Sequence, residues 1–250
     1  MPTTDSCTID VGAFDIAATL RCGRALRETA RTAPSLEDAA QRIVRLLYDS
    51  CVDPDTGQRS CALVRFYKTH AYDDLDPSLQ AFTLRQLGGE RPAPFMKSLV
   101  LLGTAGDAPA WNDRRRSRDH QVIPLASEEM ILRAPMIARL FEQFGVEPAE
   151  VLAPADDVLP EREGRTYNVF HVEAASGSPY IPEQRAFVER NGIASVVGFG
   201  GTLRSGNLFA TILFSRTRIP PESANRFRAL AVDVKAGLFF LDESRTFAVS

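Results

Sequence analysis

Apolar residues recur at intervals of three and four near the N-terminus. This spacing predicts a helix over residues 11–32, whose apolar face carries Val11, Phe14, Ala18, Cys22, Ala25 and Leu26. After a break at Pro34, a second helix is expected to begin at Ser35, because serine is a favoured N-cap and Asp38 follows three residues later. Its apolar stripe ends near Cys51, before a turn-rich stretch.

The middle of the chain combines strands, short helices and a long loop. The run CALVRFYKT at residues 61–69 is rich in β-branched and aromatic residues, with apolar side chains in both alternating sets, which predicts a strand buried on both faces. The other elements expected here are a helix opened by Asp76 and Pro77, strands at 98–102 and 121–125, a helix from Pro135 to Gly145, and a surface excursion over 147–164.

The last third shows the clearest pattern. A strand is predicted at 166–172 and a helix at 182–192, followed by two strands, IASVVGFGG and NLFATILFSR, joined by the tight turn LRSG. A final helix opens at Pro220-Pro221 and carries an apolar stripe from Phe227 to Leu238. Because a hairpin pairs antiparallel strands, this order favours an α+β fold over a parallel sheet.

Both ends of this pattern resemble the GAF domain family. The resemblance rests on SLEDAAQRIVRLLYDSC followed by CALVRFYKT, and on Gly200, Gly201, Gly206, the LFATILFS strand and Pro221-Glu222 before the last helix. It covers residues 35–241, although the middle, 72–159, is longer than a minimal member needs. The resemblance implies a central antiparallel sheet flanked by helices, with an added N-terminal helix. It divides the chain into an N-terminal helical arm (1–33), a sensory domain (34–241) and a C-terminal tail (242–250).

Composition and charge disfavour two classes of partner, nucleic acids and membranes. The formal net charge is -3 and the sequence pI about 5.7, which disfavours a nucleic-acid partner. No apolar run approaches the roughly 20 residues that span a bilayer, and the N-terminus lacks the pattern of a secretory signal, so a cytoplasmic protein without a membrane partner is expected.

Catalysis is not indicated by any motif. Neither a Gly-x-Ser-x-Gly elbow nor a phosphate-binding loop is present. The four cysteines, Cys7, Cys22, Cys51 and Cys61, form no Cys-x-x-Cys pair and are expected to be reduced thiols, with a redox-responsive Cys51–Cys61 disulfide as the alternative. One enzyme branch of the GAF family uses cysteines in its central pocket loops, whereas residues 103–120 contain none.

The resemblance places a small-ligand pocket under the central loops, and two segments combine polar and aromatic residues there. One is the loop with Trp111, Arg115 and His120; the other is the strand and turn with Asn168, His171 and Tyr180. Arg114, Arg115, Arg116 and Arg118 are read either as a site for an anionic ligand or as a solvated face. His171 is read either as a hydrogen-bonded core residue or as a ligand contact, including an axial ligand of haem.

These observations predict a non-catalytic, ligand-binding sensory domain of bacterial signal transduction. A haem- or metal-based gas or redox sensor is the first alternative and a small redox enzyme the second; no cofactor is identified. The resemblance implies a signalling partner such as a kinase or cyclase. The apolar stripes within 11–32 and 227–238 predict a homodimer built from paired helices.

Overall fold

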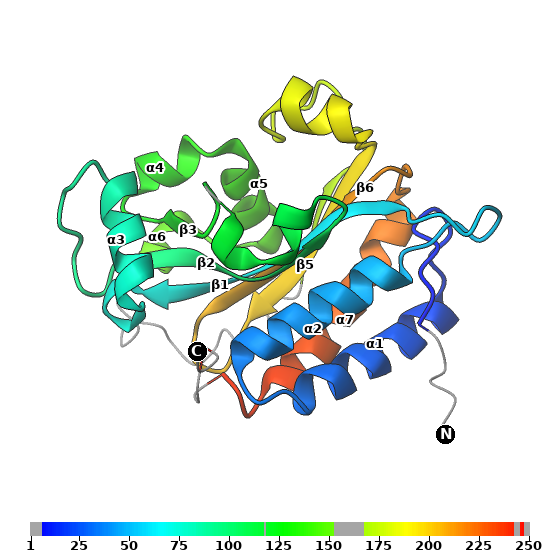
Figure 1. Ribbon diagram of the computed structural model, residues 1–250, viewed down its shortest axis with the longest axis horizontal. Coiled ribbons are helices and arrows are strands. Elements are labelled where there is room, and N and C mark those ends of the chain that lie inside the picture. Colours follow the sequence, from blue (N-terminus) through cyan, green and yellow to red (C-terminus); the bar gives the residue numbers. More distant parts are fainter. Residues whose placement is uncertain (1–6, 118, 153–167, 243–245, 248–250) are drawn as a thin grey trace.

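A single antiparallel sheet organises the chain. The computed structural model describes residues 7–117, 119–152, 168–242 and 246–247. Its 6-stranded sheet has the order β3-β2-β1-β6-β5-β4, and every neighbouring pair is antiparallel. With helices on both faces (Figure 1), the predicted α+β class with an added N-terminal helix is confirmed.

The strands match the predicted runs, with shifted ends. Their bounds are β1 Cys61–Ala71, β2 Lys97–Gly106, β3 Val122–Pro124, β4 Asn168–Val172, β5 Ser195–Thr202 and β6 Leu208–Ser215. Strand β2 is longer than expected, and the first two residues of the predicted strand at 166–172 lie outside the described residues. The β5–β6 hairpin is confirmed, and its turn contains Gly206 with a φ of 77°.

The helices at 36–50, 77–86, 135–144 and 221–238 begin where their capping residues and prolines predicted, whereas those at 128–132 and 148–152 were not predicted. Their bounds are α1 Ile16–Arg31, α2 Leu36–Ser50, α3 Pro77–Gln86, α4 Glu128–Leu132, α5 Pro135–Phe144, α6 Pro148–Leu152 and α7 Pro221–Leu238. Short 3-10 turns are η1 Tyr72–Asp74, η2 Pro109–Asn112 and η3 Arg114–Arg116, and η6 Gln184–Glu189 is a π-helix. Ser35 caps α2 by accepting a hydrogen bond from the Asp38 amide, and Gly145 ends α5 in the left-handed conformation.

Two segments differ from the sequence prediction in kind. The stretch 182–192 was expected to be an α-helix, but its helical part is the short π-helix η6. The excursion over 147–164 starts with α6, and from residue 153 onward it lies outside the described residues.

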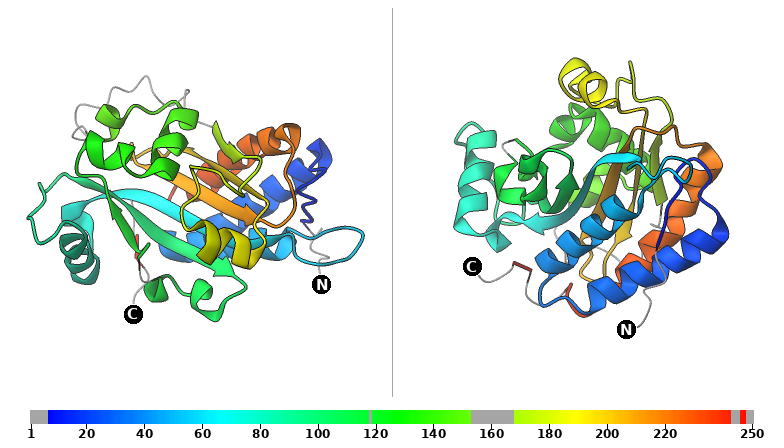
Figure 2. Two further views of the ribbon diagram at one scale, coloured as in Figure 1. Left: turned by 90° about the horizontal axis from the view of Figure 1, so that it is seen from above. Right: turned by 45° about the vertical axis from the view of Figure 1, so that its right-hand side comes forward.

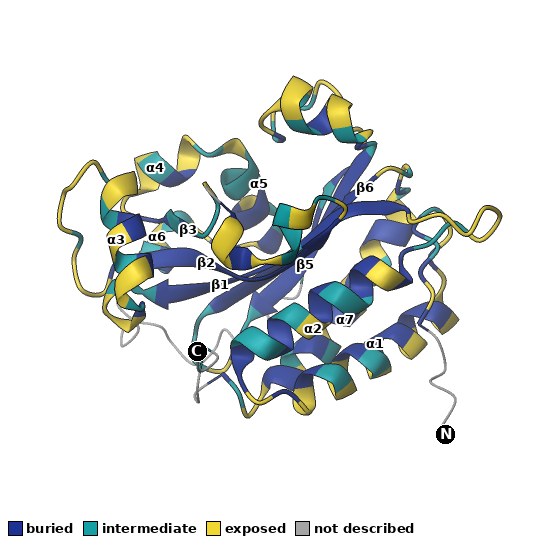
Figure 3. Cartoon of the chain, in the orientation of Figure 1, coloured by how far each residue is buried: buried dark blue, intermediate teal, exposed yellow. Residues whose placement is uncertain are grey.

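The sheet separates two apolar cores. We call the side covered by α1, α2 and α7 the helical face, and the opposite side, covered by α4, α5, α6 and the segments 107–121 and 173–194, the loop face (Figures 1 and 2). Side chains of β1 alternate between the two: Val64 and Phe66 belong to the core of the helical face, and Leu63 and Tyr67 to that of the loop face. The strands are mostly buried (Figure 3), as predicted for β1, except β4, where three of the five residues are partly exposed.

Helix α1 lies beside α7, and the two run in the same direction. Phe14 contacts Phe227 at a ring distance of 4.9 Å near the start, and at the other end a Cβ on Gly237 would come within 2.7 Å of the Ala30 Cβ. Only glycine permits such close contact. The predicted helix start at residue 11 was wrong: Asp15 is the N-cap, and the buried Val11 and Phe14 lie before it in a bent, non-helical stretch.

The predicted dimer required the apolar stripes of α1 and α7 to pair with a second copy of the chain, but both stripes are already buried within one chain. The stripe of α1 packs against α2 and α7, and that of α7 packs against α1 and the sheet, within one chain. The large apolar side chains left exposed on these helices and just after α7 are Ile16, Leu20, Val232, Phe239 and Phe240. Dimerisation remains a prediction, and light scattering that reports twice the 27.5 kDa chain mass would support it; a monomer at tens of micromolar would contradict it.

Candidate functional site

Arg65 is the unusual residue of the loop face. It lies in the centre of β1 between Leu63 and Tyr67 on an otherwise apolar surface, and it is only partly buried. Its Nη1 lies 3.5 Å from the Tyr67 hydroxyl. Its Nε is buried and has no hydrogen-bond partner among the described residues. No salt bridge to Arg65 is found in this part of the chain either. The N–H groups of a buried guanidinium normally donate to carboxylate or carbonyl oxygens. The Arg65 Nε can therefore donate to an acceptor that the described residues do not supply.

Trp111 covers the neighbouring part of this face. Its ring packs over Gly106, where an added Cβ would lie 2.9 Å from the ring, so a side chain at this position would push the indole away. Trp111 also meets Phe187 of η6 edge-on at 5.8 Å, and Phe187 meets Phe214 of β6 at 5.0 Å. This aromatic chain gives one side of the Arg65 site an apolar wall.

His120 and Glu183 bring titratable groups to the same site. Burial lowers the pKa of His120 from 6.5, the Arg65 charge lowers it further, and Glu183 and Asp119 act in the opposite direction. The imidazole is therefore neutral at pH 7 and can donate or accept a hydrogen bond. Glu183, at the start of η6, is the one non-glycine residue with positive φ in the part of the chain described, at 56°. Backbone strain of this kind is often found at functional sites.

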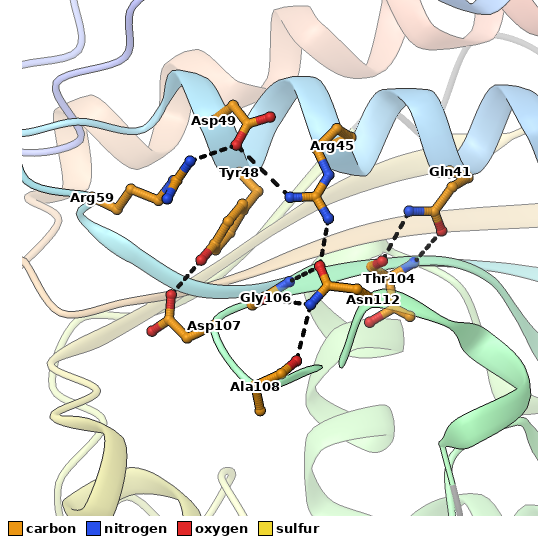
Figure 4. Close-up of polar contacts among 10 residues, drawn as sticks. All are labelled: Gln41, Arg45, Tyr48, Asp49, Arg59, Thr104, Gly106, Asp107, Ala108 and Asn112. Atoms are coloured by element: carbon orange, nitrogen blue, oxygen red, sulfur yellow. Dashed lines mark hydrogen bonds and ion pairs between the residues drawn. The ribbon is translucent and has the colours of Figure 1, made fainter. Parts of the chain in front are cut away.

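A polar network fastens the Trp111 turn to helix α2 (Figure 4). Asn112 donates to the Gly106 and Ala108 carbonyls at 2.7 and 2.9 Å, and its Oδ1 accepts from Arg45 of α2. In the same region Gln41 forms two hydrogen bonds with the backbone of Thr104, at 3.0 and 3.2 Å. Trp111 therefore packs on the loop face, while the next residue, Asn112, is hydrogen-bonded to α2 on the helical face.

Tyr48 and Asp107 complete this network at the end of β2. The Tyr48 hydroxyl donates to Asp107, which also pairs with Arg216, and the Arg59 guanidinium lies 4.8 Å from the Tyr48 ring centre (Figure 4 shows Tyr48, Asp107 and Arg59). Burial, followed by the hydrogen bond to Asp107, raises the pKa of Tyr48 to about 12. Tyr48 therefore stays protonated at physiological pH and keeps the turn attached to α2.

A separate cleft of about 390 Å³ lies at the edge of the sheet, beyond the end of β4. Its lining includes His171, Glu173, Tyr180 and Arg139, whose guanidinium lies 5.2 Å from the Tyr180 ring centre. The His171 Nε2 lies 3.0 Å from the Ile219 carbonyl, and this contact favours the neutral tautomer with a proton on Nε2. A metal or haem iron would then have to bind Nδ1.

The six residues predicted to form one site fall in two places. Trp111 and His120 flank the Arg65 site, whereas His171 and Tyr180 line the cleft at β4. Strands β6 and β5 lie between β1 and β4, which is a separation of roughly 14 Å at the usual strand spacing. Of the residues that the structure describes, those lining the cleft at β4 include neither Trp111 nor His120.

The other two candidates have local roles. Arg115 is exposed, and its backbone amide is bonded by Asp113 at 2.9 Å. Asn168 begins β4, where its side chain accepts from the amide of Val169. In the arginine run, Arg114 is buried and bonded to Glu37 at 2.6 Å, while Arg115 and Arg116 are exposed. Arg118 lies outside the described residues. The interpretation as a solvated face therefore does not fit Arg114.

Arg65, Tyr67 and Glu183 were missed by sequence reasoning. A signal for Arg65 was present, since a charged residue interrupts the apolar run of a strand expected to be buried on both faces. No local sequence pattern marks Glu183. Its charge acts on His120 only because the segment 173–194 crosses the loop face.

The cysteines differ from the prediction in part. Cys7 and Cys22 form a disulfide that ties the N-terminal segment to α1, so the expectation of reduced thiols was wrong for this pair. Cys51 and Cys61 are free, fully buried and in contact, and their hydrogen bond together with burial raises the pKa of Cys51. Within the described ranges, no group of three His, Cys, Asp or Glu side chains is arranged to hold a metal, and no helix there is long and apolar enough to cross a membrane.

Comparison with known proteins gives a structural likeness only. No protein-family model and no curated protein matches the chain. Among solved structures, it is similar to the GAF domain of a phosphoenolpyruvate-protein phosphotransferase from Acinetobacter, at 12% identity and a TM-score of 0.44 over 88% of this chain and 92% of that one. The chain resembles GAF domains, as the sequence predicted.

Two further solved structures show a similar degree of likeness. The GAF domain of a phosphoenolpyruvate-protein phosphotransferase from Coxiella burnetii has 9% identity and a TM-score of 0.45, over 89% of this chain and 92% of that one. The chromophore-binding domain of a bacteriophytochrome from R. palustris has 12% identity and a TM-score of 0.43, over 92% of this chain and 64% of that one.

Proposed function

We propose that this GAF-like chain is a sensory domain of a signalling protein, which binds a small organic anion on the loop face and catalyses no reaction. One observation carries the proposal: Arg65 is a partly buried arginine in the middle of an apolar sheet face, and its buried Nε has no hydrogen-bond partner among the described residues. Leaving such a donor unsatisfied is costly, and a carboxylate offers the planar acceptor that a guanidinium binds best.

The surroundings of Arg65 favour an aromatic carboxylate. Trp111 and Phe187 supply an apolar wall, while Tyr67 and the neutral His120 supply hydrogen-bonding groups at its polar end. These groups bind and orient a ligand. Among the described residues around Arg65, none forms the nucleophile and base pair that covalent catalysis requires.

The polar network provides a route by which the ligand would act. A ligand that contacts Trp111 shifts Asn112, and Asn112 is held by Arg45 of α2. Helix α2 packs against α1, which in turn packs along α7. A change on the loop face is thus transmitted to the helical face, where a kinase or cyclase partner could respond to it.

Replacing Arg65 tests the site directly. Titration with benzoate is expected to change the fluorescence of Trp111, the single tryptophan of the chain. Arg65→Gln should weaken benzoate binding by about 10-fold or more, because a charge-assisted hydrogen bond contributes roughly 1.5–3 kcal/mol. Arg115→Gln is the matched control, since it removes an exposed arginine of the same region. Equal affinities for both variants and the unmodified chain would refute the proposal.

The pH dependence of binding follows from His120. A bound anion offsets the Arg65 charge that lowers the pKa of His120, so binding raises that pKa and takes up a proton. Affinity should therefore increase as the pH falls from 7.5 to 5, by up to about tenfold for each unit by which the pKa rises. His120→Gln should abolish this increase, which isothermal titration in two buffers can measure through the proton uptake.

His171 distinguishes the alternatives. If the ligand occupies the cleft at β4 instead, His171→Ala weakens binding and Arg65→Gln does not. A haem sensor would show a strong absorption band near 400 nm as purified, which His171→Ala would shift or abolish. We expect a colourless protein and unchanged benzoate affinity in the His171 variant.

A further inference from the structure

The outermost helix of the helical face presents an exposed ridge. Helix α1 packs on α2 and α7, which themselves lie on the sheet (Figure 1), and the residues that α1 buries include Cys22, Leu26 and Ala30. Five exposed residues at intervals of four, four, three and four positions run along its other side: Ile16, Leu20, Arg24, Arg27 and Arg31. At about 3.6 residues per turn this spacing places them in one line, which we call the outer ridge.

The first half of the outer ridge is apolar. Ile16 and Leu20 are 67% and 68% exposed. Most of the large apolar side chains that the described residues expose belong to α1, to α7 beside it, or to the two residues after α7. Single exposed apolar residues are ordinary on protein surfaces, but a group of them in one region is typical of an interaction site.

The second half of the outer ridge is basic. Arg24 forms no hydrogen bond or ion pair with any described residue, whereas Arg27 lies 3.7 Å from Asp233 and Arg31 lies 2.9 Å from Glu28. Both pairs are solvent-exposed, so they contribute little and their arginines can exchange partners. Helix α1 contains four arginines and one acidic residue in a chain whose net charge is -3, so positive charge is concentrated on this helix.

A second copy of the chain does not complement the outer ridge. If two copies paired their α1 helices in the same direction, arginines would face arginines. If they paired in opposite directions, the arginines of one copy would lie over Ile16 and Leu20 of the other. Because the ridge contains no acidic residue, both arrangements remove water from guanidinium groups without giving them a carboxylate. A homodimer would therefore have to use another surface.

We propose that the outer ridge docks an acidic amphipathic helix of a partner protein, with apolar side chains over Ile16 and Leu20 and carboxylates over the three arginines. Guanidinium groups bind carboxylates through paired, charge-assisted hydrogen bonds, and exposed apolar side chains of one helix pack on the apolar face of another. Acidic residues stabilise the first turn of a helix. The partner helix therefore begins near Arg31 and runs antiparallel to α1.

The signalling role of this surface rests on the proposed function, but docking itself does not. The route from Trp111 through Asn112 to α2 continues to α1, which is where a docked partner would respond to the ligand. Docking requires no anion at Arg65. In the absence of benzoate, Arg65→Gln should leave partner binding unchanged, and this separates a failure of the docking surface from a failure of the ligand site.

Two synthetic helical peptides labelled with fluorescein test the docking surface. The first has glutamates in its first two turns and leucines along one face of its last two turns, and the second has lysines in place of the glutamates. Fluorescence anisotropy should show that the acidic peptide binds about tenfold more tightly than the basic one, or better. Raising the salt concentration to about 0.5 M should weaken this binding, because salt screens exposed charges.

Substitutions locate the binding surface. Arg24→Glu should weaken binding of the acidic peptide by about tenfold or more, because it places a carboxylate opposite carboxylates, and Leu20→Ala by roughly fivefold. The matched controls are Arg190→Glu at the end of η6 and Leu132→Ala in α4, which replace exposed residues outside the helical face and should leave binding unchanged. Circular dichroism should show that all four variants are folded.

Three results would overturn this docking surface. The first is equal affinity for the two peptides, or equal affinity of the Arg24 and Arg190 variants for the acidic one. The second is binding to phosphatidylglycerol-containing vesicles that Arg24→Glu abolishes, without binding of the acidic peptide, which would identify a membrane surface. The third is a dimer in light scattering that Arg24→Glu and Leu20→Ala both convert to a monomer, which would assign the ridge to a second copy.

Discussion

Leu213→Ala is expected to lower the free energy of unfolding by about 2–5 kcal/mol. Leu213 lies in β6, between β1 and β5, and none of its surface is exposed. Truncation removes buried methyl groups and leaves a cavity between the sheet and the helices of the helical face, because strands paired on both sides cannot close around it. Urea denaturation followed by circular dichroism measures the change.

The control for this substitution is Leu20→Ala in α1. Leu20 is also leucine but is 68% exposed, so its truncation should change the free energy of unfolding by less than about 0.5 kcal/mol. A loss below about 1 kcal/mol for Leu213→Ala would mean that the β5–β6 hairpin is peripheral to the core, and would contradict the fold described above.

Stability is expected to fall steeply in acid because of His70. Burial, and secondarily the Lys68 charge, lowers the pKa of His70 from 6.5 to about 3. Below pH 6.5 the unfolded chain binds a proton that the folded chain does not, so the free energy of unfolding decreases as the pH falls. The contribution is about 1.4 kcal/mol for each pH unit, or about 2.5 kcal/mol between pH 6 and pH 4, and it ceases near pH 3.

His70→Phe isolates this contribution. The variant keeps a planar ring beside Phe247 and has no nitrogen to protonate. Denaturation at a series of pH values should show the slope of stability against pH reduced by one proton near pH 5, relative to the unaltered chain. An identical slope would show that His70 is reached by solvent in the folded state.

Local chemistry made much of this fold predictable. The ends of α2, α3 and α5 depend on Ser35, Asp76 and Gly145, whose effects extend over only a few residues of backbone. The β5–β6 hairpin depends on a tight turn between two apolar runs. Caps and tight turns depend on a few neighbouring residues and not on distant parts of the chain. They could therefore be predicted from the sequence.

The site was predicted less well, for a reason visible in β1. Alternation shows which residues share a face, but both faces of β1 are apolar, and nothing local says which will face a ligand. Trp111 and His120 were identified from their loop, but their association with Arg65 depends on the pairing of β1 with β2. The structure places His171 and Tyr180 apart from them, because two other strands lie between β1 and β4.

By itself, the sequence determined the elements, the antiparallel hairpin and the fold class, because capping, turns and periodicity act over short distances. Tertiary structure alone decided that the stripe of α1 packs on α7, that the Glu183 charge acts on the pKa of His120, and that Phe247 lies beside His70. Each of these pairs joins residues more than 60 positions apart. The order of the strands and the burial of apolar surfaces from distant parts of the chain bring these residues together. Neither can be predicted from a local sequence pattern.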